Sequence, residues 1–141
     1  MSAIIRSIDK LTPELRDIVK LIVGDLKAIN SPMQVFETLR SFERQEELVK
    51  NGYSKTMNSK HLIGRAVDFV VFVNGDWSWD YKKYEKEYND YGNIAIKYGL
   101  VWGGNWLTFK DYPHAQLPDT PIITLKTISE PVNLMPVTET I

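Results

Sequence analysis

The sequence predicts an α+β domain made of a small antiparallel sheet with flanking helices. Segments with helical spacing of apolar residues are mixed with short segments rich in β-branched and aromatic residues, without the regular alternation of a parallel βαβ sheet. The chain has 141 residues, of which 43% are hydrophobic, enough for one domain with its own core. We therefore expect a single domain at residues 1–117. Residues 118–141, which include four prolines, are expected to form an extended tail with at most one added strand at 122–125.

The first half of the domain is expected to contain a helix, a strand and a second helix. The first helix is placed at residues 12–29, because Thr12 suits the N-cap, Pro13 suits the first helical position, and apolar residues follow at helical spacing. Residues 33–40 alternate loosely and carry Val, Phe and Thr, which predicts a short strand. Residues 41–52 then form a helix that begins with a serine cap and ends at a glycine.

The second half begins with a polar loop and the strongest strand signal of the chain. Residues 65–73 are almost continuously apolar and are closed by a turn at 74–76. A third helix is expected at 80–99, where it ends at a glycine. Residues 100–106 predict a short strand that runs into a glycine turn, and residues 109–117 predict a turn followed by another short strand.

A stripe of tyrosines marks one face of the third predicted helix. Its members recur every three or four residues: Tyr81, Tyr84, Tyr88, Tyr91, Ile94, Ala95 and Tyr98. This spacing favours a helix face that packs on the sheet. The alternative is an exposed surface that stacks on sugars or peptides.

Composition and charge exclude several functional classes. With 17 basic and 18 acidic residues, the chain lacks the basic excess of a general nucleic-acid binder. It has no cysteine, so a metal site must use His, Asp or Glu. The N-terminal segment is interrupted by charges, which argues against a secretory signal, and no apolar run is long enough for membrane insertion.

The two histidines of the chain each have a carboxylate close by in sequence. Asp68 follows His61 by seven residues, and Asp111 precedes His114 by three. Two imidazoles and one carboxylate, with a fourth position for water, form a common ligand set of catalytic zinc. A second carboxylate next to such a site can act as a general base.

Asp68 is the unexpected residue, because it interrupts an otherwise buried strand. An ionised carboxylate buried alone there would cost several kcal/mol, so it needs a cation or strong donors. Seven extended residues span about 20 Å, so His61 and Asp68 can share a metal only if the chain folds back, which Gly64 allows. The residues alone leave alternatives open: an ion pair of Asp68 with Arg65 or Lys60, histidines without a ligand, and turn roles for the other carboxylate.

Three segments resemble one known family. The run S-x-H-x-x-G-x-A-x-D, from Ser59 to Asp68, is similar to the signature of the LAS metallopeptidases, the zinc group of D-alanyl-D-alanine carboxypeptidases and dipeptidases. The segments GLVWGGNW…FKDYPH and LRSFERQEELVKNG resemble the L-alanyl-D-glutamate peptidase branch of that group, which includes bacteriophage endolysins. The resemblance covers residues 35–116 in the family order. It departs at Asn105, where the family commonly has Asp, and at Ala115, where an aromatic residue often stands.

The resemblance implies a hedgehog/D-Ala-D-Ala-peptidase-like fold that binds one zinc ion. Its ligands would be His61, Asp68 and His114. Asp111 matches the catalytic acid/base position, and Arg40 matches the arginine that holds the substrate or the developing oxyanion. Further residues are expected to line the cleft or to support the ligands by hydrogen bonding: Ser59, Trp102, Trp106 and Tyr112.

The activity implied by the resemblance is hydrolysis of an amide bond in the peptide stem of bacterial peptidoglycan, with L-alanyl-D-glutamate as the expected bond. One alternative is a D-alanyl-D-alanine carboxypeptidase of wall remodelling. Another is a non-catalytic, zinc-containing wall-binding module of the same fold, which would not need Asp111. We further expect a monomer that is made in the host cytoplasm without an export signal and reaches the wall through a holin pore during host-cell lysis. The alternative is a virion-borne component that pierces the wall.

Overall fold

The computed structural model describes residues 2–120, so the strand expected at 122–125 and most of the expected tail lie outside the described residues. The three α-helices are α1 (Pro13–Ala28), α2 (Phe42–Lys50) and α3 (Glu85–Lys97). The five strands are β1 (Met33–Glu37), β2 (Ala66–Val73), β3 (Asp76–Ser78), β4 (Val101–Trp102) and β5 (His114–Gln116). Three short 3₁₀ helices complete the described chain: η1 (Ile8–Lys10), η2 (Lys60–Ile63) and η3 (Gly103–Asn105). No α-helix within residues 2–120 has both the length and the apolar character that a membrane span requires.

Strand β2 is the centre of an antiparallel sheet. The strand order is β1-β2-β5-β4, and β3 pairs with the C-terminal half of β2. The N-terminal half of β2 pairs with β5, in a register that places Asp68 opposite His114. The predicted α+β fold with a small antiparallel sheet is therefore confirmed.

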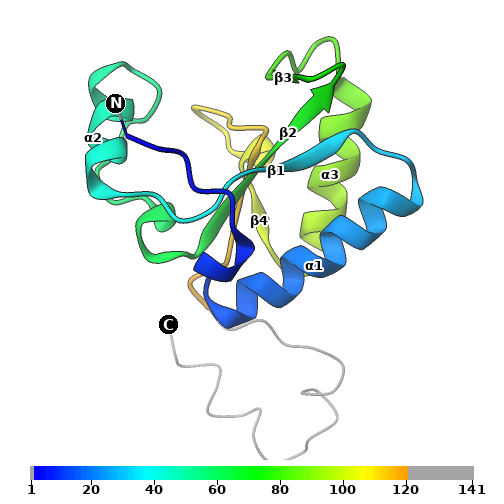
Figure 1. Ribbon diagram of the computed structural model, residues 1–141, viewed down its shortest axis with the longest axis horizontal. Helices are drawn as coiled ribbons and strands as arrows, with labels where there is room; N and C mark the ends of the chain where they lie inside the picture. Colours follow the sequence, from blue (N-terminus) through cyan, green and yellow to red (C-terminus); the bar gives the residue numbers. More distant parts are fainter. Residues whose placement is uncertain (1, 121–141) are drawn as a thin grey trace, which may run out of the picture.

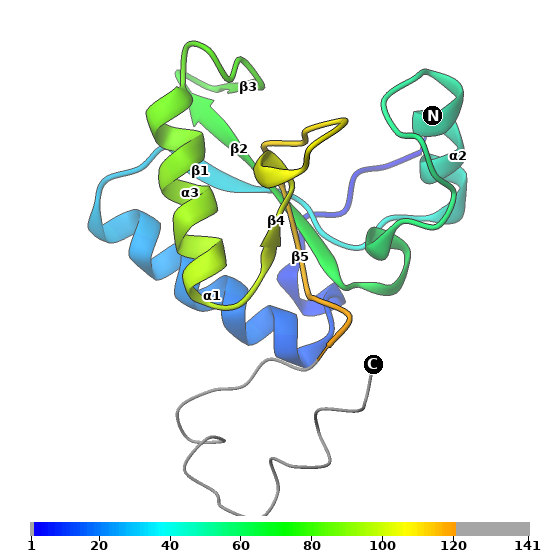
Figure 2. The ribbon, with the colours of Figure 1, turned by 180° about the vertical axis from the view of Figure 1, so that it is seen from behind.

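Helices α1 and α3 form the hydrophobic core against one face of the sheet (Figure 1). Alternate residues of β2 point into this core, among them Val67, Phe69 and Val71, which are fully buried. The residues between them, including Asp68, therefore point to the opposite face. Figure 2 shows the molecule from behind, with α2 on the far side of β2 from α3. The sheet thus has one face in the core and one face available for a site.

The tyrosine stripe packs against the sheet, as its spacing predicts. Tyr88 and Tyr91 are both 0% exposed. The Tyr91 hydroxyl donates to the Pro113 carbonyl oxygen at 2.7 Å, and the ring centroids of Tyr91 and Phe69 are 4.8 Å apart. Burial raises the pKa of Tyr88 to about 12. These contacts assign the stripe to the core, and the stacking surface considered as an alternative is not formed by these two residues.

Several element boundaries differ from the sequence-based expectation, each for a local reason. Strand β1 ends at Glu37 because Thr38 turns to the N-terminal segment, where its backbone N–H donates to the Ile5 carbonyl oxygen at 2.7 Å. Helix α3 begins at Glu85, because Asp80 accepts hydrogen bonds from the backbone of the next residues and forms a turn before it. Strand β3 was not predicted: the turn at 74–76 is a tight hairpin that returns the chain along β2.

A register shift in β1 positions Glu37 on the face of the sheet opposite the helices. Val35 pairs with Phe69, but the next pair along is Glu37 with Asp68, so Phe36 is an extra residue. The ring of Phe36 lies 5.0 Å from that of Trp77, and the Glu37 carboxylate lies beside Arg40. This bulge therefore brings Glu37 directly across from Asp68, on the face opposite the helices.

Candidate metal centre

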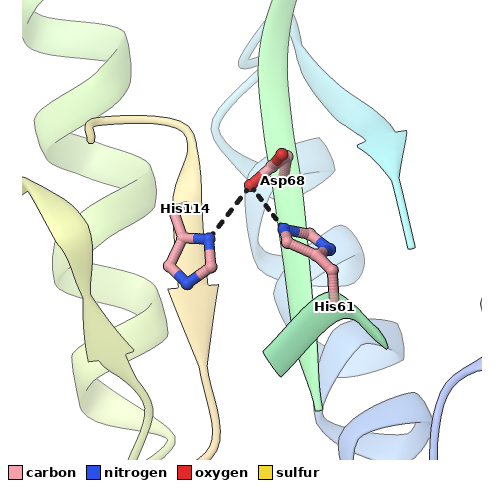
Figure 3. A group of neighbouring side chains, drawn as sticks. All are labelled: His61, Asp68 and His114. Carbon is pink, nitrogen blue, oxygen red and sulfur yellow. Dashed lines mark hydrogen bonds and ion pairs between the residues drawn. The ribbon is translucent and has the colours of Figure 1, made fainter. Parts of the chain in front are cut away.

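Three side chains converge on the face of the sheet that points away from α1 and α3. His61 comes from η2, Asp68 from the middle of β2 and His114 from the start of β5. Asp68 Oδ1 lies 3.2 Å from His61 Nε2 and 3.4 Å from His114 Nδ1. Figure 3 shows the two imidazoles on either side of this one oxygen. One nitrogen or oxygen atom from each residue lies within 4.8 Å of the others, which is close enough for all three to hold one metal ion.

His61 reaches Asp68 because the chain folds back between them. Gly64 ends η2 in the left-handed conformation, with φ of 72°, and a Cβ there would lie 3.0 Å from the Lys10 carbonyl oxygen. His61 Nδ1 lies 2.8 Å from the Thr38 carbonyl oxygen, which can only accept. The Thr38 contact therefore places a proton on Nδ1, which leaves Nε2, the nitrogen that faces Asp68, as the one available to a metal.

His114 is oriented in the same manner from the other side. Its Nε2 lies 2.8 Å from Gln116 Oε1, an oxygen that accepts a hydrogen bond, and Gln116 stands two residues further along the same face of β5. This leaves Nδ1, the nitrogen that faces Asp68, as the one available to a metal. In both histidines a hydrogen bond fixes the tautomer that metal ligation needs.

The donor set fits a divalent metal such as zinc. Two neutral imidazole nitrogens and one carboxylate oxygen are its usual ligands, and the site is almost closed to solvent: His61 is 1% and His114 7% exposed. Burial acts to raise the pKa of Asp68, but His61 and His114 outweigh it and hold that pKa well below its usual value. Asp68 is therefore an anion in a partly buried place, ready to bind a cation.

Arg40 contacts the second oxygen of the same carboxylate. Its Nη2 donates to Asp68 Oδ2 at 3.3 Å and to Glu37 Oε1 at 2.9 Å, while Nη1 donates to Gln45 Oε1 at 2.8 Å. Arg44, one turn into α2, also donates to Glu37. Asp68 thus divides its two oxygens between the histidine pair and the arginine.

Asp111 lies in the turn that precedes β5. Its backbone N–H donates to the Gly103 carbonyl oxygen at 3.0 Å, and its own carbonyl accepts from the His114 N–H at 3.1 Å. Pro113 disfavours a helical conformation at the preceding Tyr112, and this hydrogen-bonded turn is accordingly not helical. Burial and, next, the Asp68 carboxylate raise the pKa of Asp111 to about 6, against the opposing charges of the histidines and Arg40. A carboxyl group with this pKa can exchange a proton near neutral pH.

The other predicted site residues lie at different depths in the structure. Ser59 caps η2, and its Oγ accepts from the His61 N–H at 3.1 Å. Trp106 is half-buried, with its ring 5.2 Å from that of His114. Trp102 is buried and donates through Nε1 to the Tyr112 carbonyl oxygen at 2.8 Å, while the Tyr112 ring stacks on Tyr81.

Four residues of this network were not singled out from the sequence: Glu37, Arg44, Gln45 and Gln116. Gln116 has a readable signal, because it stands two residues after His114 in a predicted strand and so shares its face. Glu37 lies 31 residues before Asp68 and meets it only through the bulge in β1. No local pattern in the sequence carries that information.

Comparison with known proteins places this geometry among cell-wall peptidases. A family model described as D-alanyl-D-alanine carboxypeptidase matches residues 52–117. The chain is 30% identical to the L-alanyl-D-glutamate peptidase of Listeria phage A118 over 78% of its length, and spans 39% of that longer relative. It is 34% identical to the peptidoglycan L-alanyl-D-glutamate endopeptidase CwlK of Bacillus subtilis, with 74% of each chain covered. The crystal structure of the Serratia marcescens L-Ala D-Glu endopeptidase ChiX matches with a TM-score of 0.62 and 37% identity, covering 79% of this chain and 83% of that one.

Proposed function

This chain belongs to the LAS metallopeptidases, in the branch of the L-alanyl-D-glutamate peptidases, and on that premise we propose that it hydrolyses the L-alanyl-D-glutamate bond of peptidoglycan stems. The observation that carries the proposal is the convergence of His61, Asp68 and His114 on one point, with Asp111 beside them. A wall-binding module would need the fold but not a carboxyl group whose pKa is raised to about 6 next to the ligands.

We propose that the ion held by this site is zinc. His61 Nε2, Asp68 Oδ1 and His114 Nδ1 would hold it, since each keeps a free lone pair. When bound, zinc supplies a Lewis acid for the scissile carbonyl and lowers the pKa of water toward neutrality. The Thr38 carbonyl and Gln116 keep the two imidazoles in the tautomers that this role requires.

Asp111 is the proposed general base and acid. Its carboxylate takes a proton from the attacking water and returns that proton to the leaving amine. A pKa of about 6 suits both steps, because the group is mostly ionised at neutral pH yet still accepts a proton readily. The backbone of Asp111 is fixed by its hydrogen bonds with the Gly103 carbonyl and the His114 N–H, so its carboxyl group keeps its position relative to the proposed ligands.

Arg40 is the proposed stabiliser of the negative charge that develops on the carbonyl oxygen. Its guanidinium is held in place by Glu37, Gln45 and Asp68, so the positive charge is fixed before substrate arrives. Trp106 and Tyr112 are proposed to line the cleft around the substrate, and buried Trp102 to support Tyr112 through its backbone.

The test compares two variants on purified peptidoglycan. We expect Asp111→Ala to keep stoichiometric zinc but to lose at least about 100-fold in turnover, since general acid–base catalysis contributes that much. His61→Ala is expected to lose both zinc and turnover. Metal content is measured by atomic absorption, and turnover by release of new amino termini. An Asp111→Ala enzyme with nearly normal turnover would remove the base assignment.

Mass analysis of the products decides which bond is cut. The family description matched by residues 52–117 also favours a D-alanyl-D-alanine carboxypeptidase. That enzyme would release free D-alanine, whereas the proposed activity leaves a new D-glutamyl amino terminus. Loss of either product on chelation, and its recovery with zinc, would exclude the non-catalytic wall-binding module.

We also propose a role in host-cell lysis, which the match to a phage peptidase supports. The chain would act as a monomer and would reach the wall from the host cytoplasm through a holin pore. Expression in bacteria with and without a co-expressed holin tests this role, because only the pair is expected to lower the optical density of the culture.

A further inference from the structure

Glu37 is a buried carboxylate between two arginines at the edge of the metal centre. It is 1% exposed, and its oxygens accept from Arg40 Nη2 at 2.9 Å and from Arg44 Nη2 at 3.1 Å and Nε. A buried anion of this kind is costly without such partners, so two cations hold it in place. Glu37 belongs neither to the proposed ligands nor to the proposed catalytic groups.

Arg40 connects this carboxylate to the metal ligand. The same nitrogen, Nη2, donates to Glu37 Oε1 at 2.9 Å and to Asp68 Oδ2 at 3.3 Å. The shorter contact is the one to Glu37. The four groups form a row of alternating charge: Arg44, Glu37, Arg40 and Asp68.

The two oxygens of Asp68 are in competition for positive charge. Oδ1 faces both histidines, and Oδ2 faces Arg40. If Glu37 lost its charge, Asp68 would be the one anion left in contact with Arg40 among the described residues. The guanidinium would then move closer to Asp68 and neutralise the charge that a metal cation needs.

We propose that Glu37 is a positioning residue that, itself held by Arg44, restrains Arg40 at the second oxygen of Asp68 and so keeps the first oxygen available to the metal. The inference rests on the metal site of the proposed function. It assigns Glu37 an effect on metal affinity with no direct contact to the metal, and makes Arg44 a competitor of Arg40 for the Glu37 carboxylate.

The two neighbours of Arg40 in this row should have different effects on zinc affinity. Glu37→Gln keeps the shape but removes the charge, and we expect zinc to bind about tenfold more weakly. Arg44→Gln leaves Glu37 to Arg40 alone, which draws Arg40 away from Asp68, so zinc should bind as tightly as in the wild type or more tightly. Zinc affinity is measured by competition with a chromophoric chelator. A role limited to folding stability predicts weaker binding in both variants, and that result would overturn the proposal.

A second comparison separates positioning from a simple electrostatic field. In an Arg40→Met background, Glu37→Gln should change zinc affinity by less than about twofold, because the residue through which Glu37 acts is gone. An equal, tenfold loss in both backgrounds would show that Glu37 acts through its field and not through Arg40, and would refute the proposal.

Folding controls keep the test decisive. Thermal unfolding of each metal-free variant reports its stability separately from its zinc affinity. If Glu37→Gln does not fold, Glu37→Asp keeps the charge on a shorter side chain and should bind zinc more tightly than Glu37→Ala. Equal affinities of these two variants would count against the proposal. A wild-type chain that binds no zinc would instead refute the proposed function, so the two failures are distinguishable.

Discussion

Replacing Gly103 by alanine is expected to inactivate the enzyme by displacing Asp111. Gly103 lies at the start of η3, and a Cβ added there would stand 2.3 Å from the Asp111 carbonyl oxygen and 3.1 Å from the Asp111 Cβ. Contacts of a real Cβ essentially never fall below 3.0 Å, so the backbone of Asp111 must retreat by about 0.7 Å. The contact is with backbone, which cannot rotate away as a flexible side chain would.

This displacement should move both the Asp111 carboxyl group and His114, which lie at the two ends of the turn. Asp111 carries the proposed base, and its carbonyl oxygen accepts from the His114 N–H at 3.1 Å. A misplacement of about 1 Å can cost a catalytic group on the order of 100-fold. We therefore expect kcat/KM to fall roughly 30-fold to 100-fold, with a loss of about 1–3 kcal/mol in unfolding free energy from overpacking.

The assay is release of new amino termini from a purified muropeptide, at a temperature well below the unfolding midpoint of the variant. Zinc content is measured on the same sample. Gly24→Ala is the matched control, because a Cβ there meets nothing within 4 Å and improves helix propensity in α1 by up to about 1 kcal/mol. A folded, zinc-loaded Gly103→Ala enzyme with kcat/KM within twofold of the wild type would refute the reasoning.

Four further predictions concern protons and buried contacts. Burial acts to lower the pKa of His114, but Asp68 outweighs it and raises that pKa above 6.5. Protons therefore compete with zinc, and chelator competition should show zinc affinity rising as the pH rises through the raised pKa of His114. For the same reason the metal-free protein should lose unfolding free energy as pH rises from 6.5 through the raised pKa of His114, in urea titrations at several pH values. Asp68→Asn should lower the pKa of Asp111 from about 6, because the Asp68 carboxylate is the second largest cause of that raised pKa after burial. The pKa is measured by NMR of the carboxyl carbon in the metal-free protein, and an unchanged value would argue that the two carboxyl groups are not close. Tyr91→Phe removes the hydrogen bond from the Tyr91 hydroxyl to the Pro113 carbonyl and should lower the free energy of unfolding by about 1 kcal/mol in thermal unfolding. The loss is small because the Pro113 carbonyl still accepts from the Phe69 N–H, and a loss above about 3 kcal/mol would contradict this.

Much of the fold follows from local signals in the sequence. Thr12 caps α1 and its hydroxyl oxygen accepts from the Leu15 N–H, as the spacing of Thr, Pro and apolar residues predicts. Strand β2 follows from a run of apolar residues. Strand β3 does not follow from the sequence analysis, because Asn74 and Gly75 there indicate only the end of a strand. In the structure both residues adopt positive φ and form the tight turn of a hairpin.

The candidate site was predictable only in part, because its residues lie far apart in sequence. Asp68 signals its own need for a cation by being buried in an apolar strand, and family resemblance supplies the third ligand. The tautomers of His61 and His114 depend on Thr38 and Gln116, whose positions follow from the backbone path around the sheet. In this sequence, Glu37 stands opposite Asp68 only because β1 contains a one-residue bulge, which no periodicity reveals.

The bulge in β1 also determines where the chain can change length. The register before it is fixed by the pair Val35–Phe69 and the register after it by the pair Glu37–Asp68, with Phe36 left over between them. Loss of Phe36 would restore a regular ladder and still leave Glu37 opposite Asp68, because alternate residues of a strand share a face. A residue inserted or lost between Glu37 and Arg40 would instead move the arginine relative to both carboxylates. Removal of Phe36 should therefore keep Glu37 opposite Asp68 but lose the contact with Trp77, whereas a change of length between Glu37 and Arg40 should displace the arginine.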